Sequence, residues 1–156
     1  MTMAYVIAKT EPNVQLVAFT THPNPFTMNG VETIKELPRL HAAVHGGMHD
    51  GTDCAIPMLW ASQAHLDVDA FVILTDEETW AGRIHPLEAL SEYRYNMNKP
   101  SRIVSVGFAA HRYSIREADD AGALAIVGFD SAAPGLMQDF LAQPDPIITQ
   151  LKSQPV

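Results

Sequence analysis

Three runs of apolar residues along the chain predict strands that are buried in a sheet. Short, continuous apolar runs that stop at polar residues or glycine are typical of strands covered on both faces. These runs are residues 70–74, 102–107 and 124–129. Residues 14–20 are rich in β-forming side chains and alternate partly between apolar and polar, so we expect a fourth strand there. Phe26 and Met28 are candidates for a short edge strand.

Apolar residues between these runs recur at the spacing of an α-helix. We expect helices over residues 1–8, 31–44, 56–64, 85–97 and 134–141. In the first of them Met3, Val6 and Ile7 share a face, and Thr52 or Asp53 is placed to cap the third. The alternation of helices and strands predicts an α/β fold with a doubly wound, mainly parallel sheet and flanking helices.

Length and composition indicate a single globular domain. The chain has 156 residues, of which 47% are apolar, enough to bury a core. We expect the domain to occupy residues 1–142 and a proline-containing tail, residues 143–156, to be loosely held. Ten Lys and Arg against eighteen Asp and Glu give a net charge of −8, which disfavours non-specific binding to nucleic acid.

The same sequence carries weak signals of its compartment. A single cysteine, Cys54, cannot form an internal disulfide, which favours a reducing compartment. There is no apolar run of about 18 residues that would span a membrane, and the N-terminus has no basic start followed by an apolar run, as a secretory signal would. We therefore expect a cytoplasmic protein with no membrane contact.

Polar residues gather at two places where the predicted sheet should present its carboxyl edge. The strand at residues 70–74 runs into Thr75, Asp76, Glu77 and Glu78, and Gly51-Thr52-Asp53 precedes a helix. Ligands of open α/β sheets bind at that edge, and hydroxyl and carboxylate oxygens suit Mg²⁺. A solvated acidic turn and a helix cap are the alternative interpretations of these two loops.

Other candidate chemistry is weaker. His41, His45 and His49 are spaced by four, as ligands on a helix face would be, but two glycines interrupt them, so exposed histidines are the favoured interpretation. Cys54 lies near a helix N-terminus, where its thiol could be activated, but the sequence shows no base for it and a buried structural role is favoured. Phosphate-loop and serine-nucleophile motifs are absent.

A run of motifs resembles one known family. They are residues 51–58 (GTDCAIPM), residues 71–82 (FVILTDEETWAG), His85-Pro86, Ala89-Leu90, Tyr93-Arg94, residues 119–122 (DDAG) and residues 128–130 (GFD). Together they resemble the von Willebrand factor A (vWA) domain at the C-terminal end of Ro 60 kDa autoantigen-like proteins. The resemblance extends from about residue 4 to residue 141, nearly the whole chain, and is specific to the Ro type of A domain.

The resemblance implies a Rossmann-like sheet with a metal-ion-dependent adhesion site at its carboxyl edge, built from three loops. The threonine of the second loop corresponds to Thr52 and the aspartate of the third to Asp76, with Asp53, Glu77 and Glu78 acting through bound waters or simply solvated. The first loop, an Asp-x-Ser-x-Ser sequence after the first strand, is not found in this sequence, which we interpret as starting within the helix that follows it. A divalent cation, most naturally Mg²⁺, should therefore bind weakly to this chain alone.

The missing first strand would lie at the centre of the sheet. Residues 14–20 and 70–74 would then each present an unpaired edge, which invites pairing with another chain. We hypothesise that a companion polypeptide supplies the strand, or that the chain self-associates. The helical-repeat ring, which in the family binds small non-coding RNA, is also absent from this sequence.

We expect a binding module and not an enzyme, acting as part of a Ro-like RNA-binding ribonucleoprotein. The cation would offer a coordination position to an acidic group of a partner. The alternatives are a Mg²⁺-dependent hydrolase or phosphoryl-transfer domain, which would need a positioned base or nucleophile, and a structural fragment that pairs with a companion chain.

Overall fold

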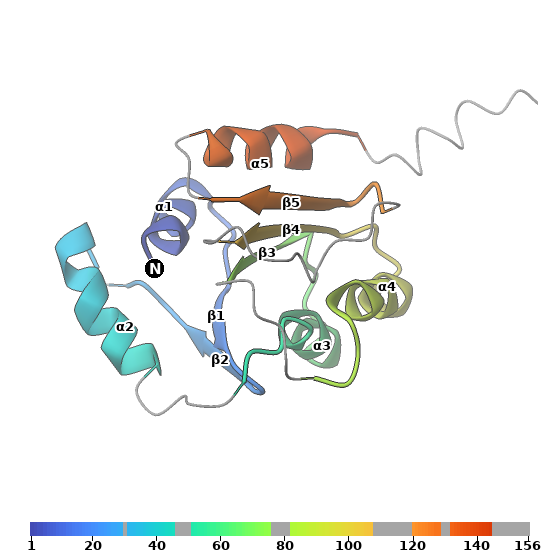
Figure 1. Cartoon of the computed structure of the whole chain (residues 1–156), viewed down its shortest axis with the longest axis horizontal. Helices are drawn as coiled ribbons and strands as arrows, with labels where there is room; N and C mark the ends of the chain where they lie inside the picture. Colours follow the sequence, from blue (N-terminus) through green and yellow to red (C-terminus); the bar gives the residue numbers. More distant parts are fainter. Residues whose placement is uncertain (30, 46–50, 76–81, 108–119, 129–131, 145–156) are drawn as a thin grey trace, which may run out of the picture.

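The computed structural model describes residues 1–29, 31–45, 51–75, 82–107, 120–128 and 132–144. Its centre is a three-stranded parallel sheet in the order β3-β4-β5 (Figure 1). The strands are β3 (Ala70–Thr75), β4 (Arg102–Gly107) and β5 (Ala123–Val127). Each coincides, within two residues at either end, with an apolar run of the sequence, because parallel strands are covered by helices and need apolar side chains.

The N-terminal strands form a separate sheet. Strand β1 (Leu16–Phe19) pairs antiparallel with β2 (Pro23–Phe26), in a sheet of two strands. Among the described residues, no strand pairs with the edge of β1 that faces away from β2 or with the edge of β3 that faces away from β4. Within the part of the chain that the structure describes, the expected mainly parallel sheet is thus present as two pieces, each with an open edge.

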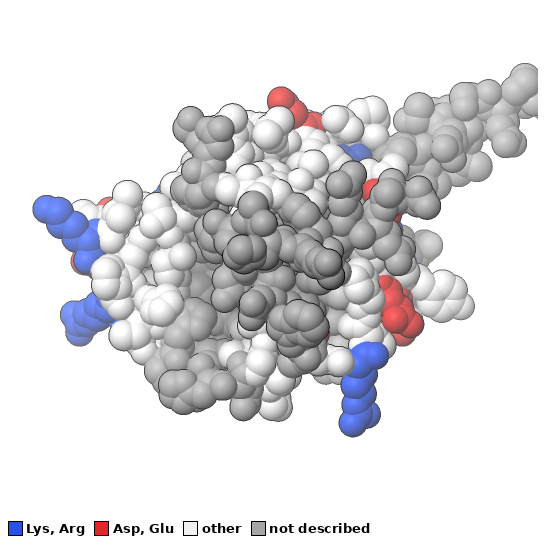
Figure 2. Space-filling model, viewed as in Figure 1, with Lys and Arg blue, Asp and Glu red and all other residues white. Residues whose placement is uncertain are grey.

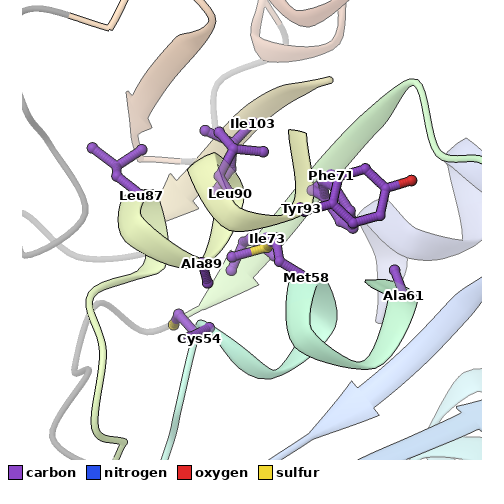
Figure 3. Close-up of a cluster of buried hydrophobic side chains, with 11 residues drawn as sticks. Cys54, Met58, Ala61, Phe71, Ile73, Leu87, Ala89, Leu90, Tyr93 and Ile103 are labelled. Carbon is purple, nitrogen blue, oxygen red and sulfur yellow. The ribbon is translucent and has the colours of Figure 1, made fainter. Parts of the chain in front are cut away.

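Helices cover both faces of the parallel sheet, which makes the fold doubly wound (Figure 1). On one face lie α3 (Ile56–Gln63) and α4 (Pro86–Met97), and on the other lie α1 (Thr2–Thr10) and α5 (Ala133–Ala142). Figure 3 shows the core on the α3 and α4 side. Its buried members are Cys54, Ala55, Met58, Ala61, Phe71, Ile73, Leu87, Ala89, Leu90, Tyr93 and Ile103.

Helix α1 bridges the two sheets. Met3 and Ile7 pack with side chains of the parallel sheet and α5, whereas Ala4 and Tyr5 pack with the cluster around β1, β2 and α2 (Leu37–His45). Val6, which we expected to share a face with Met3 and Ile7, is 38% exposed. Met3 is the buried residue of α1. The helix packs between two clusters, so its other side chains are divided between them and remain partly exposed.

Strand β3 is less completely buried than its sequence predicts. Phe71, Ile73 and Thr75 are buried, whereas Val72 and Leu74 on the opposite face are half-buried. The alternation follows from the two-residue period of a strand. The expectation that β3 is fully buried on both faces is therefore wrong for this chain. The half-buried face is on β3, the same strand that has an open edge.

Local backbone chemistry shifts two predicted boundaries. The helix expected over residues 31–44 begins later, as a short 3-10 turn, η1 (Ile34–Glu36), that leads into α2. Thr33 and Glu36 form a reciprocal capping box there, which fixes the start. The edge strand expected at Phe26 and Met28 is β2, which ends at Phe26, and Met28 is buried in the cluster beneath α1 and α2.

Two polar side chains of α4, Tyr93 and Arg94, connect this helix to neighbouring segments. The Tyr93 hydroxyl donates to Leu66 O at 2.5 Å and accepts from Val68 N–H at 2.8 Å, which ties α4 to the loop before β3.

Arg94 forms a bidentate pair with Asp120, at 2.7 and 3.3 Å. Burial raises the pKa of Asp120, but the hydrogen bonds from Arg94 and from a backbone N–H outweigh it and leave that pKa below its ordinary value.

The C-terminal helix is anchored by a buried cation. Arg102 is 9% exposed and its guanidinium donates to Phe140 O and to Gln143 O at the end of α5. Cations are favourable at a helix C-terminus, where backbone carbonyls have no partner within the helix. None of the helices in the described part of the chain has the length and apolar character needed to cross a membrane.

Candidate functional site

The polar loop before α3 lies against the end of β1. Asp53 N–H donates to Thr20 O at 3.0 Å, so Asp53 is held against the turn that joins β1 to β2. Thr52 is half-buried beside it. On the parallel sheet, Thr75 is the last residue of β3 and is 6% exposed.

Asp53 is buried, with 6% of its surface exposed. Its Oδ1 accepts from Ala55 N–H at 2.9 Å, and its backbone oxygen accepts from Ile56 N–H at 3.2 Å. We predicted Thr52 or Asp53 as the helix cap. That prediction is wrong in its register, because α3 begins at Ile56 with Ala55 as the N-cap, and Asp53 instead closes the turn that leads into it. Pro57 lies in the first turn of the helix, where a proline is tolerated.

Gly82 lies directly over the Asp53 side chain. Its φ is +111°, a conformation that other residues rarely adopt. A Cβ built on Gly82 would lie 2.6 Å from Asp53 Cγ and 2.6 Å from each carboxylate oxygen. The chain that leaves β3 at Thr75 therefore returns against Asp53. Sequence reasoning did not single out Gly82, since its only signal was that the motif at residues 71–82 ends in glycine.

The Asp53 carboxylate has few hydrogen-bonding or charged partners among the described residues. Ala55 N–H is the hydrogen-bond donor to its side chain, and no Lys or Arg of the described residues forms an ion pair with it. A buried carboxylate with so little compensation is costly unless a cation or a bound polar group completes its environment. The donor set of a threonine hydroxyl and a carboxylate fits a hard cation such as Mg²⁺.

Asp76, Glu77 and Glu78 lie outside the described residues, so the expected meeting of Thr52 and Asp76 stays a prediction. His49 also lies outside them. His41 is on α2 and exposed, and no three His, Cys, Asp or Glu side chains of the described ranges are grouped to hold a metal ion. Cys54 is fully buried, in agreement with a structural cysteine.

The parallel sheet covered on both faces by helices, with polar loops at its carboxyl edge, defines a Rossmann-like α/β domain of the A-domain class. A family model described as the Ro60 vWA domain matches residues 1–141. The chain belongs to this family, the vWA domains of Ro60.

Named relatives agree with this assignment. A protein named RNA-binding protein RO60 from Deinococcus radiodurans is 38% identical over 138 residues, which are 88% of this chain and 25% of that protein. A protein of the same name from Caenorhabditis elegans is 44% identical over 91 residues, 58% of this chain and 14% of that protein.

The fold of a solved relative is also similar. The crystal structure of the Deinococcus radiodurans RO (RSR) protein matches with a TM-score of 0.72 and 34% identity, over 89% of this chain and 27% of that one. The chain thus spans about a quarter of the length of these proteins from Deinococcus radiodurans.

Proposed function

We propose that this domain is a cation-dependent docking module of a Ro-like ribonucleoprotein. Thr52 and Asp76 would bind a divalent cation, preferably Mg²⁺, directly. Asp53 would act through a water bound to the cation, and Glu77 and Glu78 would add negative charge near it. The cation would leave a coordination position open to an acidic group of a partner, since Mg²⁺ takes few protein ligands and exchanges waters for others.

The observation that carries the proposal is the buried, incompletely compensated carboxylate of Asp53 beside Thr52. A helix cap alone would be served by Ser, Thr or Asn without burying a negative charge. A nearby cation offsets that cost. Asp53, which is adjacent in sequence to the candidate ligand Thr52, therefore carries a negative charge that a bound cation would stabilise.

Protein docking is a better role for this domain than direct RNA contact. The relatives are named as RNA-binding proteins. This chain, however, has a net charge of −8. Figure 2 shows Lys and Arg side chains of the described residues at separate places around the margin of one face. Binding to nucleic acid depends mainly on the neutralisation of phosphates by Lys and Arg, which a chain with this excess of acidic residues does not favour.

A titration with Mn²⁺, followed by electron paramagnetic resonance, tests the cation site. We expect weak binding by the chain, and a loss of about tenfold or more in affinity in Asp76→Ala and in Thr52→Val. Asp139→Asn, which removes a negative charge from the exposed side of α5, is the control for net charge and should bind as the parent chain does. Equal affinities for Asp76→Ala, Thr52→Val and Asp139→Asn would refute the assignment.

We also propose that the space between β1 and β3 takes one further strand from a companion polypeptide. The open edges of the two strands support this. Phe19 of β1 packs against the cluster that contains Phe71 of β3, so the two pieces are neighbours. Since α1 lies on one side and α3 on the other, the inserted strand should be apolar on both faces, and its loop would complete the cation site.

Sedimentation equilibrium and hydrogen exchange test the open edges. About half of the N–H groups of an edge strand point away from its neighbour and exchange freely. We expect alternate amides of β1 and β3 to exchange quickly in the dilute chain and slowly once a strand is added. Self-association would instead appear as a mass that rises with concentration and protects the same amides. A cooperatively folded monomer with every β3 amide protected would contradict the proposal.

A further inference from the structure

The two outer edges of the antiparallel sheet differ in the hydrogen-bond donors that they offer. Opposite residues in such a sheet alternate between pairs that bond to each other and pairs whose N–H and C=O groups point outwards. Thr20 N–H donates to His22 O, so this pair is of the bonded kind. Along the register from there, the outward-pointing pairs of β1 and β2 are Phe19 with Pro23 and Val17 with Pro25.

Both outward-pointing residues of β2 are prolines, which have no N–H group. The N–H groups of Asn24 and Phe26 point towards β1, so β2 offers carbonyl oxygens but no donor at its outer edge. Asn24 and Pro25 are exposed, and no strand in the described part of the chain pairs with this edge. The edge is therefore accessible, but it cannot form a complete ladder with another strand, which needs donors from both strands.

The outer edge of β1 has the donors that β2 lacks. Val17 and Phe19 belong to the same two outward-pointing pairs, and each has an N–H and a C=O group directed away from β2. We propose that Pro23 and Pro25 restrict strand pairing of this sheet to β1 and prevent copies of the chain from pairing through β2. The partner that this sheet fits is then one extended segment bonded to Val17 and Phe19, which rests on the companion strand proposed above.

Sedimentation equilibrium of the double variant Pro23→Thr/Pro25→Thr tests the blocked edge of β2. Threonine favours strands, and the two substitutions restore both outward-pointing N–H groups. We expect the variant to self-associate at least about tenfold more tightly than the parent chain, through antiparallel pairing of β2 with β2 of a second copy. Pro38→Thr is the control for the loss of a proline, because Pro38 is exposed on α2, outside both sheets, and this variant should associate as the parent does.

Hydrogen exchange locates the contact in the associated variant. We expect the amides introduced at positions 23 and 25 to become protected as the concentration rises. The proposal is overturned if the double variant is folded by circular dichroism and associates no more than the parent, if Pro38→Thr associates equally, or if only amides of β1 become protected.

Pro25→Thr alone keeps the proposal testable if the double variant does not fold. It restores one donor, and a folded Pro25→Thr chain that associates no more tightly than the parent overturns the proposal as well. The companion strand fails separately: slow exchange of the Val17 and Phe19 amides in the dilute parent would contradict it, whereas self-association of the proline variants through β2 would still support the blocked edge.

Discussion

Removing one oxygen atom from Tyr93 should destabilise the domain measurably. Tyr93 is fully buried, and its hydroxyl serves two backbone groups at once, Leu66 O and Val68 N–H. Tyr93→Phe keeps the ring and its edge-to-face contact with Phe71, at 4.9 Å between centroids, but leaves both backbone groups without this partner. Each unsatisfied buried group costs about 1–3 kcal/mol. Since Leu66 and Val68 are half-buried and water reaches them in part, we expect a total near 2 kcal/mol.

Urea unfolding followed by circular dichroism measures this loss. With a slope of about 2 kcal/mol/M, the midpoint should fall by about 1 M. Tyr95→Phe is the matched control, since Tyr95 is on the same helix but 87% exposed, and its change should stay within about 0.5 kcal/mol. If both variants unfold at the same urea concentration, water replaces the hydroxyl of Tyr93, and its two hydrogen bonds do not stabilise the fold.

Three other changes have expected outcomes. Because the pKa of Asp120 is lowered, its pairing with Arg94 stabilises the fold above the ordinary value of 3.8 and is lost as the pH falls below that value; acid unfolding of Asp120→Asn should lack this step. Gly122→Ala places a Cβ 2.3 Å from the Arg94 guanidinium and should lower the thermal midpoint, whereas Gly135→Ala, with nothing within 4 Å, should not. Arg102→Met should accelerate hydrogen exchange in α5, and unchanged exchange would show that the guanidinium anchors nothing.

The sequence predicted the parallel sheet well because its strands are buried between helices. The range 102–107 is the whole of β4, all six residues of which are buried. The range 85–97 is accurate for α4 because local signals mark both ends: His85 accepts from Leu87 N–H, and Asn98 adopts a left-handed conformation with φ of 49°. Such boundaries depend on a few neighbouring residues and can be read locally.

The sequence could not predict features that depend on tertiary contacts. The half-burial of Val72 and Leu74 depends on what lies beside β3, which no local pattern records. For the same reason the Asp53–Gly82 contact, between residues 29 apart in number, was not expected from the spacing of either loop. The chemistry of Thr52 and Asp53 was recognisable as oxygen donors, but the burial that makes Asp53 significant comes from the fold.

The most direct test of the cation site is diffraction from crystals of the chain grown with Mn²⁺, recorded at the manganese absorption edge. We expect an anomalous peak within about 2.5 Å of Thr52 Oγ1. We also expect this peak to disappear in crystals of Thr52→Val. No peak at this edge of the sheet, or a peak that persists unchanged in Thr52→Val, would show that Thr52 does not bind the cation.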